Sequence, residues 1–188
     1  MVKNLLLISA LLAIPFSASA QSTNPATDMN PKTEMHPSEQ KLSSNDESFL
    51  NDAAQAGLAE IEGGKLAQQK AKTSEVKDFA TNMITDHTKV GDELKQLAAK
   101  KGVTVPTEPS LLQKGELKAL SLLDDKFDEN YVDRMAVAAH ENTVELFKKT
   151  ADEAEDGDIK VFAQKTLPAL EEHLKMAKAL HPTVSKTQ

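Results

Sequence analysis

The chain has 188 residues, no cysteine and a formal net charge of -7 at pH 7. A chain of this length holds one ordinary domain, and a composition rich in Ala, Leu, Lys and Glu favours helices over sheets. The acidic charge repels phosphate groups and therefore excludes nucleic acid as an expected partner, and the lack of cysteine excludes disulfides and a thiol nucleophile.

Residues 1–20 have the pattern of a secretory signal peptide. Lys3 precedes LLLISALLAIPF, an apolar segment too short to span a bilayer, and SASA places small residues at Ala18 and Ala20. We expect cleavage after Ala20, no transmembrane segment in the mature chain, and a periplasmic or secreted protein, with a peripheral position at the outer membrane as a further option. An uncleaved membrane anchor is the alternative. The polar, proline-containing residues 21–45 predict a disordered linker.

The first predicted helix begins at a capping-box pattern formed by Ser44 and Glu47 and continues to about residue 72. Glycines are unfavourable inside a helix, so their presence suggests that a neighbouring helix approaches closely. The glycines concerned are Gly57, Gly63 and Gly64. Thr73 or Ser74 is expected to cap the second helix, which ends before Gly102.

The second half of the chain begins with a long connection. A short helix is expected within it, over residues 111–123, and a third long helix over residues 128–155. Asp158 is expected to cap a fourth helix over residues 159–180, with a kink at Pro168 and an end at Pro182.

These elements predict an all-α fold, a four-helix bundle over residues 46–181 followed by a disordered tail over residues 182–188. The links between the first and second helices and between the third and fourth helices are short, whereas the middle connection is long. That order favours a ferritin-like bundle, and an up-down-up-down bundle is the alternative.

Three histidines lie on the apolar stripes of three different helices: His87, His140 and His173. Counting residues from the predicted turns at about 1.5 Å per residue places His87 and Glu60 about 20 Å from one turn, and the other two histidines about 25 Å from the other turn. In helices about 40 Å long, all four side chains then fall within about one helical turn of a common layer.

Two interpretations of this layer remain open. Three imidazoles and a carboxylate suit a first-row transition metal, so Glu60, His87, His140 and His173 form a candidate site for iron, copper or zinc. Alternatively, the histidines form a structural layer that fixes helix register by hydrogen bonds to Glu60, Tyr131, threonines or backbone carbonyls.

Several segments resemble one known family. The segments AAQAGLAEIEGGKLAQQKA, VKDFATNMITDHTKVGDELKQLAAKKGV, AAHENTVELF and FAQKTLPALEEHLKMA are similar to the bacterial domain-of-unknown-function family 4142, whose members are often labelled predicted outer membrane proteins. The resemblance covers residues 46–181 and implies a ferritin-like helical bundle in an exported protein, without an established activity.

The di-iron pattern of ferritin-like proteins is broken in this sequence. That pattern needs a glutamate three residues before a histidine on each of two helices. Here Ile84 and Leu170 occupy those positions before His87 and His173, and the third helix carries His140 instead of a glutamate. Ferroxidase or oxygenase chemistry is therefore not carried over from the resemblance.

Two functional hypotheses follow from the sequence. The first is a non-catalytic, exported helical bundle that acts in the cell envelope or in a stress response, with a homo-oligomer or an envelope protein as its partner. The second is a bundle that binds one transition-metal ion through the core residues and is open to redox chemistry. An amphipathic protein at a lipid surface is a third option, which the acidic surface disfavours.

Overall fold

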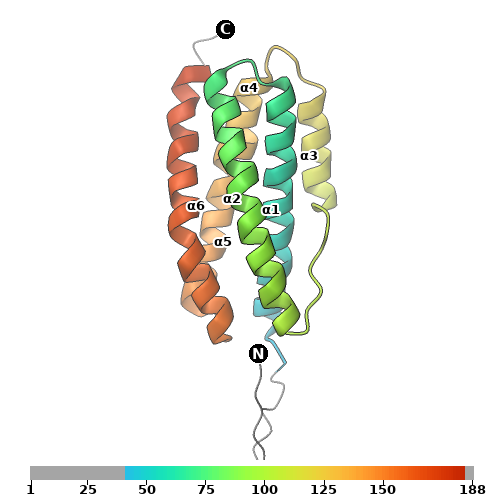
Figure 1. The fold of residues 1–188 in the computed structure, drawn as a ribbon, viewed down its shortest axis with the longest axis vertical. Coiled ribbons are helices and arrows are strands. Elements are labelled where there is room, and N and C mark those ends of the chain that lie inside the picture. Colours follow the sequence, from blue (N-terminus) through green and yellow to red (C-terminus); the bar gives the residue numbers. More distant parts are fainter. Residues whose placement is uncertain (1–40, 185–188) are drawn as a thin grey trace, which may run out of the picture. The chain divides into compact units, whose positions relative to one another are not determined.

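The computed structural model describes residues 41–184, so the predicted signal peptide, residues 21–40 of the linker and residues 185–188 lie outside the described part. Every regular element in that part is a helix, which confirms the all-α prediction (Figure 1). The elements are α1 (Ser44–Lys70), α2 (Ser74–Lys100), α3 (Leu111–Ser121), α4 (Phe127–Asn130), the π-helix η1 (Tyr131–Ala138), α5 (Ala139–Glu153) and α6 (Gly157–Val184).

The long helices pack side by side as a bundle. In Figure 1, α1 and α2 are antiparallel neighbours joined at one end, and α5 and α6 are antiparallel neighbours joined at the opposite end. The connection after α2 returns along the bundle and contains α3, as the sequence predicted. Within residues 41–184, no helix has a stretch long and apolar enough to cross a membrane.

Several helix ends differ from the prediction. The first helix is capped by Ser43, whose Oγ accepts a hydrogen bond from the Asp46 amide at 3.1 Å, so the predicted Ser44 capping box is wrong. At the start of α6, Asp156 and not Asp158 supplies the cap, because its Oδ1 accepts from the amides of Asp158 and Ile159. The end of α2 is as expected, since Gly102 has a left-handed backbone with φ of 70°.

Pro182 does not end the last helix, which continues to Val184. A proline interrupts a helix by removing its own N–H and by crowding the preceding turn. Pro182 lies close enough to the end that the remaining turn stays helical, and Val184 is buried against the core. Pro168 also lies inside α6.

The glycine prediction is confirmed for two of the three positions. A Cβ at Gly64 would lie 2.8 Å from the Ile84 side chain, and a Cβ at Gly63 would lie 3.0 Å from Met135 Cε, so both glycines allow a close helix contact. For Gly57 the prediction is wrong, because a Cβ there meets no atom within 4 Å. The space beside Gly57 belongs to a cavity described below.

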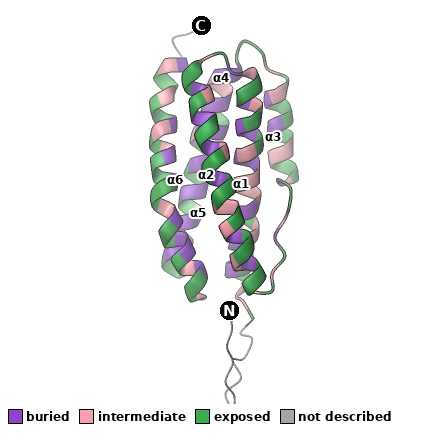
Figure 2. Cartoon of the chain, viewed as in Figure 1, coloured by how far each residue is buried: buried purple, intermediate pink, exposed green. Residues whose placement is uncertain are grey.

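The core consists of two apolar clusters. The first takes its residues from α1, α2, α3, α4, η1 and α6, and the second mainly from α1, α2, α5 and α6. The first lies toward the α1–α2 turn and includes Ala59, Met83, Ala136 and Ala177, and the second lies toward the α5–α6 turn and includes Ala54, Leu94, Val144 and Leu170. Figure 2 shows the buried residues on the sides of the helices that face one another. Along α2, the η1–α5 segment and α6, a buried histidine lies between residues of the two clusters: His87, His140 and His173. On α1 the buried polar residue is Glu60, which follows Ala59 of the first cluster.

Candidate metal centre

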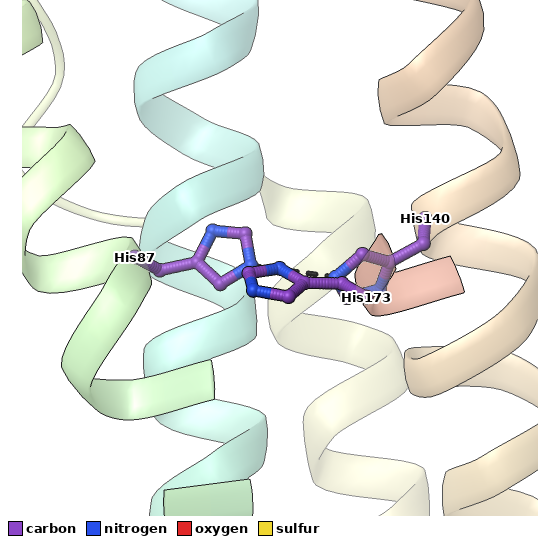
Figure 3. Close-up of side chains that lie close together, drawn as sticks. All are labelled: His87, His140 and His173. Carbon is purple, nitrogen blue, oxygen red and sulfur yellow. Dashed lines mark hydrogen bonds between the residues drawn. The ribbon is translucent and has the colours of Figure 1, made fainter. Parts of the chain in front are cut away.

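Three helices bring the three core histidines together. His87 comes from the middle of α2, His140 from the first turn of α5, and His173 from α6. Their rings converge in the space between the helices (Figure 3). The side chains are almost completely buried, with 4%, 0% and 5% of the surface of His87, His140 and His173 exposed.

The rings form a nearly regular triangle. The centroids of His87 and His140 are 5.4 Å apart, those of His87 and His173 are 5.4 Å apart, and those of His140 and His173 are 5.6 Å apart. One nitrogen from each ring can be chosen such that all three lie within 4.8 Å of one another. A small movement of the side chains would bring these nitrogens to the spacing of ligands around a single ion.

The Nε2 atoms of His87 and His140 are only 3.4 Å apart. Two nitrogens at this distance can both lie about 2.0 Å from one metal ion, which gives an angle at the ion of about 116°. That angle is between the tetrahedral and trigonal values. A nitrogen of His173 would have to move closer to complete the same geometry, which side-chain rotation can provide.

Glu60 lies behind His140 and outside the triangle of nitrogens. Its Oε1 is 3.5 Å from His140 Nδ1, on the other side of the ring from Nε2. Burial raises the pKa of the Glu60 carboxyl well above its usual value, because the charged form loses its hydration. Within the described residues, Glu60 Oε2 has no hydrogen-bond partner. Within the described residues His140 Nδ1 also makes no hydrogen bond, so Glu60 lies beside this nitrogen without bonding to it and outside the space that the three rings share.

Asp86 contacts His173 across the interface between α2 and α6. Its Oδ2 is 3.0 Å from His173 Nε2. A carboxylate accepts hydrogen bonds, so this contact places the His173 proton on Nε2 and leaves the lone pair on Nδ1. Nδ1 is buried and has no hydrogen-bond partner in residues 41–184. One ring nitrogen of His173 is thus held by a carboxylate and the other is available inside the core.

Burial keeps the first two imidazoles neutral. The pKa of His87 is well below its usual value because of burial, and His140 and His173 lower it further by repulsion. Burial and His173 also lower the pKa of His140 to about 4, against the opposing effect of the Met135 and Ala136 carbonyls. Neutral imidazoles have a free lone pair, which is the form that binds metal ions.

The π-helix η1 positions the residues that precede His140. Tyr131 and Met135 are buried in η1, and His140 lies in the first turn of α5, two residues after η1 ends. π-helical turns are frequent at functional sites. Burial raises the pKa of Tyr131, and nearby Glu60 raises it further, so its hydroxyl stays protonated.

Other carboxylates that flank the histidines in sequence face solvent. Glu141, Glu171 and Glu172 form ion pairs with Lys178, Lys148 and Lys175 on exposed surface. Asp86 is the exception, and it contacts a histidine of a different helix instead of its neighbour His87. The sequence pointed to Asp86 because it is the neighbour of His87 in α2. It could not show that Asp86 contacts His173, because that contact depends on how α6 packs against α2.

Solved structures with the same fold include proteins of low sequence identity. A DUF305 fragment from Deinococcus radiodurans has a TM-score of 0.66 and 12% identity, over 76% of this chain and 98% of its own. The Cu(I)-bound form of CopM has a TM-score of 0.61 and 19% identity, over 73% and 96%. A DUF305 protein from Streptomyces coelicolor has a TM-score of 0.63 and 16% identity, over 76% of this chain and 94% of its own.

Among curated proteins, none matches this sequence. The family resemblance inferred from the helix segments is confirmed, because the family model of DUF4142, a domain of unknown function, matches residues 31–180. The match includes all four residues of the predicted site. The chain therefore belongs to the DUF4142 family.

Proposed function

We propose that this protein binds one transition-metal ion between His87, His140 and His173. The observation that carries the proposal is the triangle of buried imidazoles, whose nitrogens lie within 4.8 Å of one another. Three helices supply one ring each, so no local sequence feature accounts for their convergence. In this proposal Glu60 and Asp86 orient the ligands His140 and His173 and do not bind the ion themselves.

Copper in its Cu(I) state is the first candidate, with zinc and iron as the alternatives. Three neutral imidazoles add no negative charge, so a bound ion keeps its full charge in a core of low dielectric constant. A monovalent ion costs less to bury there than a divalent one, and imidazole is a suitable ligand for copper. The Cu(I)-bound form of CopM has a similar fold and supports this choice.

We further propose that the protein acts outside the cytoplasm as a non-catalytic metal-binding bundle in the cell envelope or in a stress response. The secretory pattern of residues 1–20 supports export. The helix order, with a long connection between two antiparallel hairpins, supports a ferritin-like bundle. The absence of a Glu-x-x-His pattern at His87 and His173 argues against a di-iron centre.

The test measures metal content and thermal stability together. Protein loaded with Cu(I) without oxygen and then dialysed is expected to retain one copper per chain. An ion present at about 100 times its Kd adds about 2.7 kcal/mol to the free energy of unfolding, which raises Tm by roughly 5–10 °C. Zinc and ferrous iron are tested in parallel.

Variants locate the site. His87→Ala and His173→Ala are expected to lose the copper and the rise in Tm. His181→Ala is the matched control, because His181 is a half-exposed histidine of α6 beside Asp133. Wild-type protein without stoichiometric metal and without a change in Tm for any of the three ions would refute the proposal and leave the structural layer as the explanation.

A further inference from the structure

An apolar cavity reaches the ring of His87. It has a volume of about 70 Å³ and is lined mainly by residues of α1 and α2, together with Pro106 of the long connection. Its inner wall is formed by Leu94, Phe147 and Leu170. Of the three core histidines, His87 is the one that lines this cavity.

Two glycines keep the cavity open. Gly57 of α1 and Gly91 of α2 both line it, and a Cβ at either position would meet no atom within 4 Å. Neither glycine has a left-handed backbone, since Gly102 is the one described glycine with positive φ. The helix backbone would therefore allow a side chain at both positions. Because both residues are glycines, the space beside His87 stays empty of protein atoms.

The lining determines what can bind. Apolar cavities of this kind stay dry and take up apolar molecules, and a cavity of about 150 Å³ holds benzene or xenon. A cavity of about 70 Å³ therefore suits a molecule smaller than benzene, down to a single xenon atom or a diatomic molecule. The charged residues Asp92 and Lys95 lie on exposed parts of α2, so ions meet polar groups only at the rim.

A second, larger pocket has a different character. It has a volume of about 420 Å³ and lies beside α3 and η1, with charged lining residues that include Asp52, Glu116 and Arg134. It reaches Glu60 and none of the three histidines. The larger pocket therefore offers charged groups to polar molecules, whereas the cavity beside His87 offers mainly apolar side chains.

We propose that the cavity between α1 and α2 binds a small uncharged apolar molecule, of the size of carbon monoxide or dioxygen, against the ring of His87. Three imidazoles leave at least one coordination position of an ion open. In the metal-loaded protein the ligand therefore lies beside that open position. This last step rests on the proposed metal site, whereas occupation of the cavity does not.

The first experiment uses the metal-free full chain and xenon as the probe. Xenon pressure is expected to shift the methyl NMR signals of cavity residues Val90, Leu94 and Leu170 and to leave those of Val76 and Val132 unchanged. Gly57→Leu and Gly91→Leu fill the cavity and are expected to lose these shifts. Gly115→Leu is the matched control, because it adds a side chain in equally open space on α3. Unshifted cavity methyls in the wild type, or shifts that persist in both filled variants, would overturn the inference.

The second experiment uses the Cu(I)-loaded protein and carbon monoxide. An infrared C–O stretch of a copper adduct is expected for the wild type and for Gly115→Leu, and its loss is expected for Gly57→Leu at unchanged copper content. A copper-loaded wild type without an adduct would overturn the placement of the ligand beside the ion. Failure to load copper is a different result, since it contradicts the proposed function while the xenon shifts still report on the cavity.

Discussion

Asp86 determines which nitrogen His173 presents to the core. Its carboxylate is half-exposed and contacts His173 Nε2 at 3.0 Å. Asp86→Asn replaces the charged acceptor by an amide that can also donate, so the ring loses its fixed proton position. Loss of such an outer partner lowers metal affinity by about 10- to 100-fold. We expect this decrease in a competition titration with a Cu(I) chelator.

The control for this prediction is Glu172→Gln. Glu172 is the sequence neighbour of His173, but its carboxylate pairs with Lys175 on exposed surface. Its replacement is expected to leave copper affinity unchanged. Equal affinities for Asp86→Asn and the wild type would show that Asp86 has no part in orienting the ring.

Glu60 and His140 give opposite pH dependences of stability. Burial raises the pKa of the Glu60 carboxyl well above the value of about 4.5 that it has in the unfolded chain, so its contribution to stability falls as pH rises above about 4.5. The His140 pKa is about 4 in the fold against 6.5 in the unfolded chain, so its contribution of about 3 kcal/mol is lost as pH falls from 6.5 to about 4.

Without Glu60, the loss of stability that His140 causes at low pH should no longer be offset. In metal-free Glu60→Gln, the free energy of unfolding is expected to fall more steeply between pH 7 and pH 5 than in the wild type. Urea unfolding at several pH values measures this slope. If both proteins show the same slope, Glu60 is ionised in the fold and the assignment of its proton is wrong.

At the scale of the elements, one buried carboxylate holds each end of the bundle. Asp128 accepts hydrogen bonds from the amides of Lys72 and Thr73 at the α1–α2 turn, at 3.0 Å and 2.8 Å. At the other end, Asp46 accepts from the Asp156 amide at 2.9 Å before α6. Each contact joins one helical hairpin to the other.

Asp128→Ala removes the charged acceptor of two partly buried amides. We expect a loss of about 2 kcal/mol in the free energy of unfolding, because hydrogen bonds to charged groups contribute about 1.5–3 kcal/mol. Urea unfolding measures the loss. Asp125→Ala is the control, since Asp125 pairs with Lys72 on exposed surface and such pairs contribute little. A loss below about 0.5 kcal/mol for Asp128→Ala would contradict the proposed role of this carboxylate.

The elements also show what the sequence could predict. The 3–4 spacing of apolar residues in α2 and α6 located both helices, because burial of one face requires that spacing. The π-helix η1 was not predicted, since one extra residue per turn changes the backbone without interrupting the apolar pattern. Ser43 and Ser44 are neighbouring serines that could each cap α1, and only the backbone geometry shows that Ser43 is the cap.

The arrangement of the four candidate side chains was also predicted in part. Helix rise alone placed Glu60, His87, His140 and His173 at one height, because height depends only on residue number. Helix rotation and side-chain direction decide which atoms meet, and the sequence contains neither. The position of Glu60 behind His140 and the contact of Asp86 with His173 therefore required the packed structure.

At the scale of the whole molecule, a polar layer interrupts an otherwise apolar core. If the layer exists to bind an ion, it should cost stability in the metal-free protein, because buried polar groups are expensive unless fully paired. Replacing Glu60, His87, His140 and His173 together by leucine joins the two clusters. We expect this variant to be at least as stable as the metal-free wild type in urea and to bind no copper.

If the free energy of unfolding of the leucine variant is lower than that of the wild type by more than about 2 kcal/mol, the four polar residues fix the helix register, since satisfied polar networks can specify a core. The comparison is made at pH 7, where the titration of His87 and His140 does not contribute.

The origin of the three rings has a consequence for the order of folding. His87 belongs to the hairpin of α1 and α2, whereas His140 and His173 belong to the hairpin of α5 and α6. An ion that needs all three rings binds only after the hairpins have docked. Contacts absent from the transition state act on the unfolding rate and leave the folding rate almost unchanged. Copper is therefore expected to extend the lifetime of the folded protein without accelerating its formation.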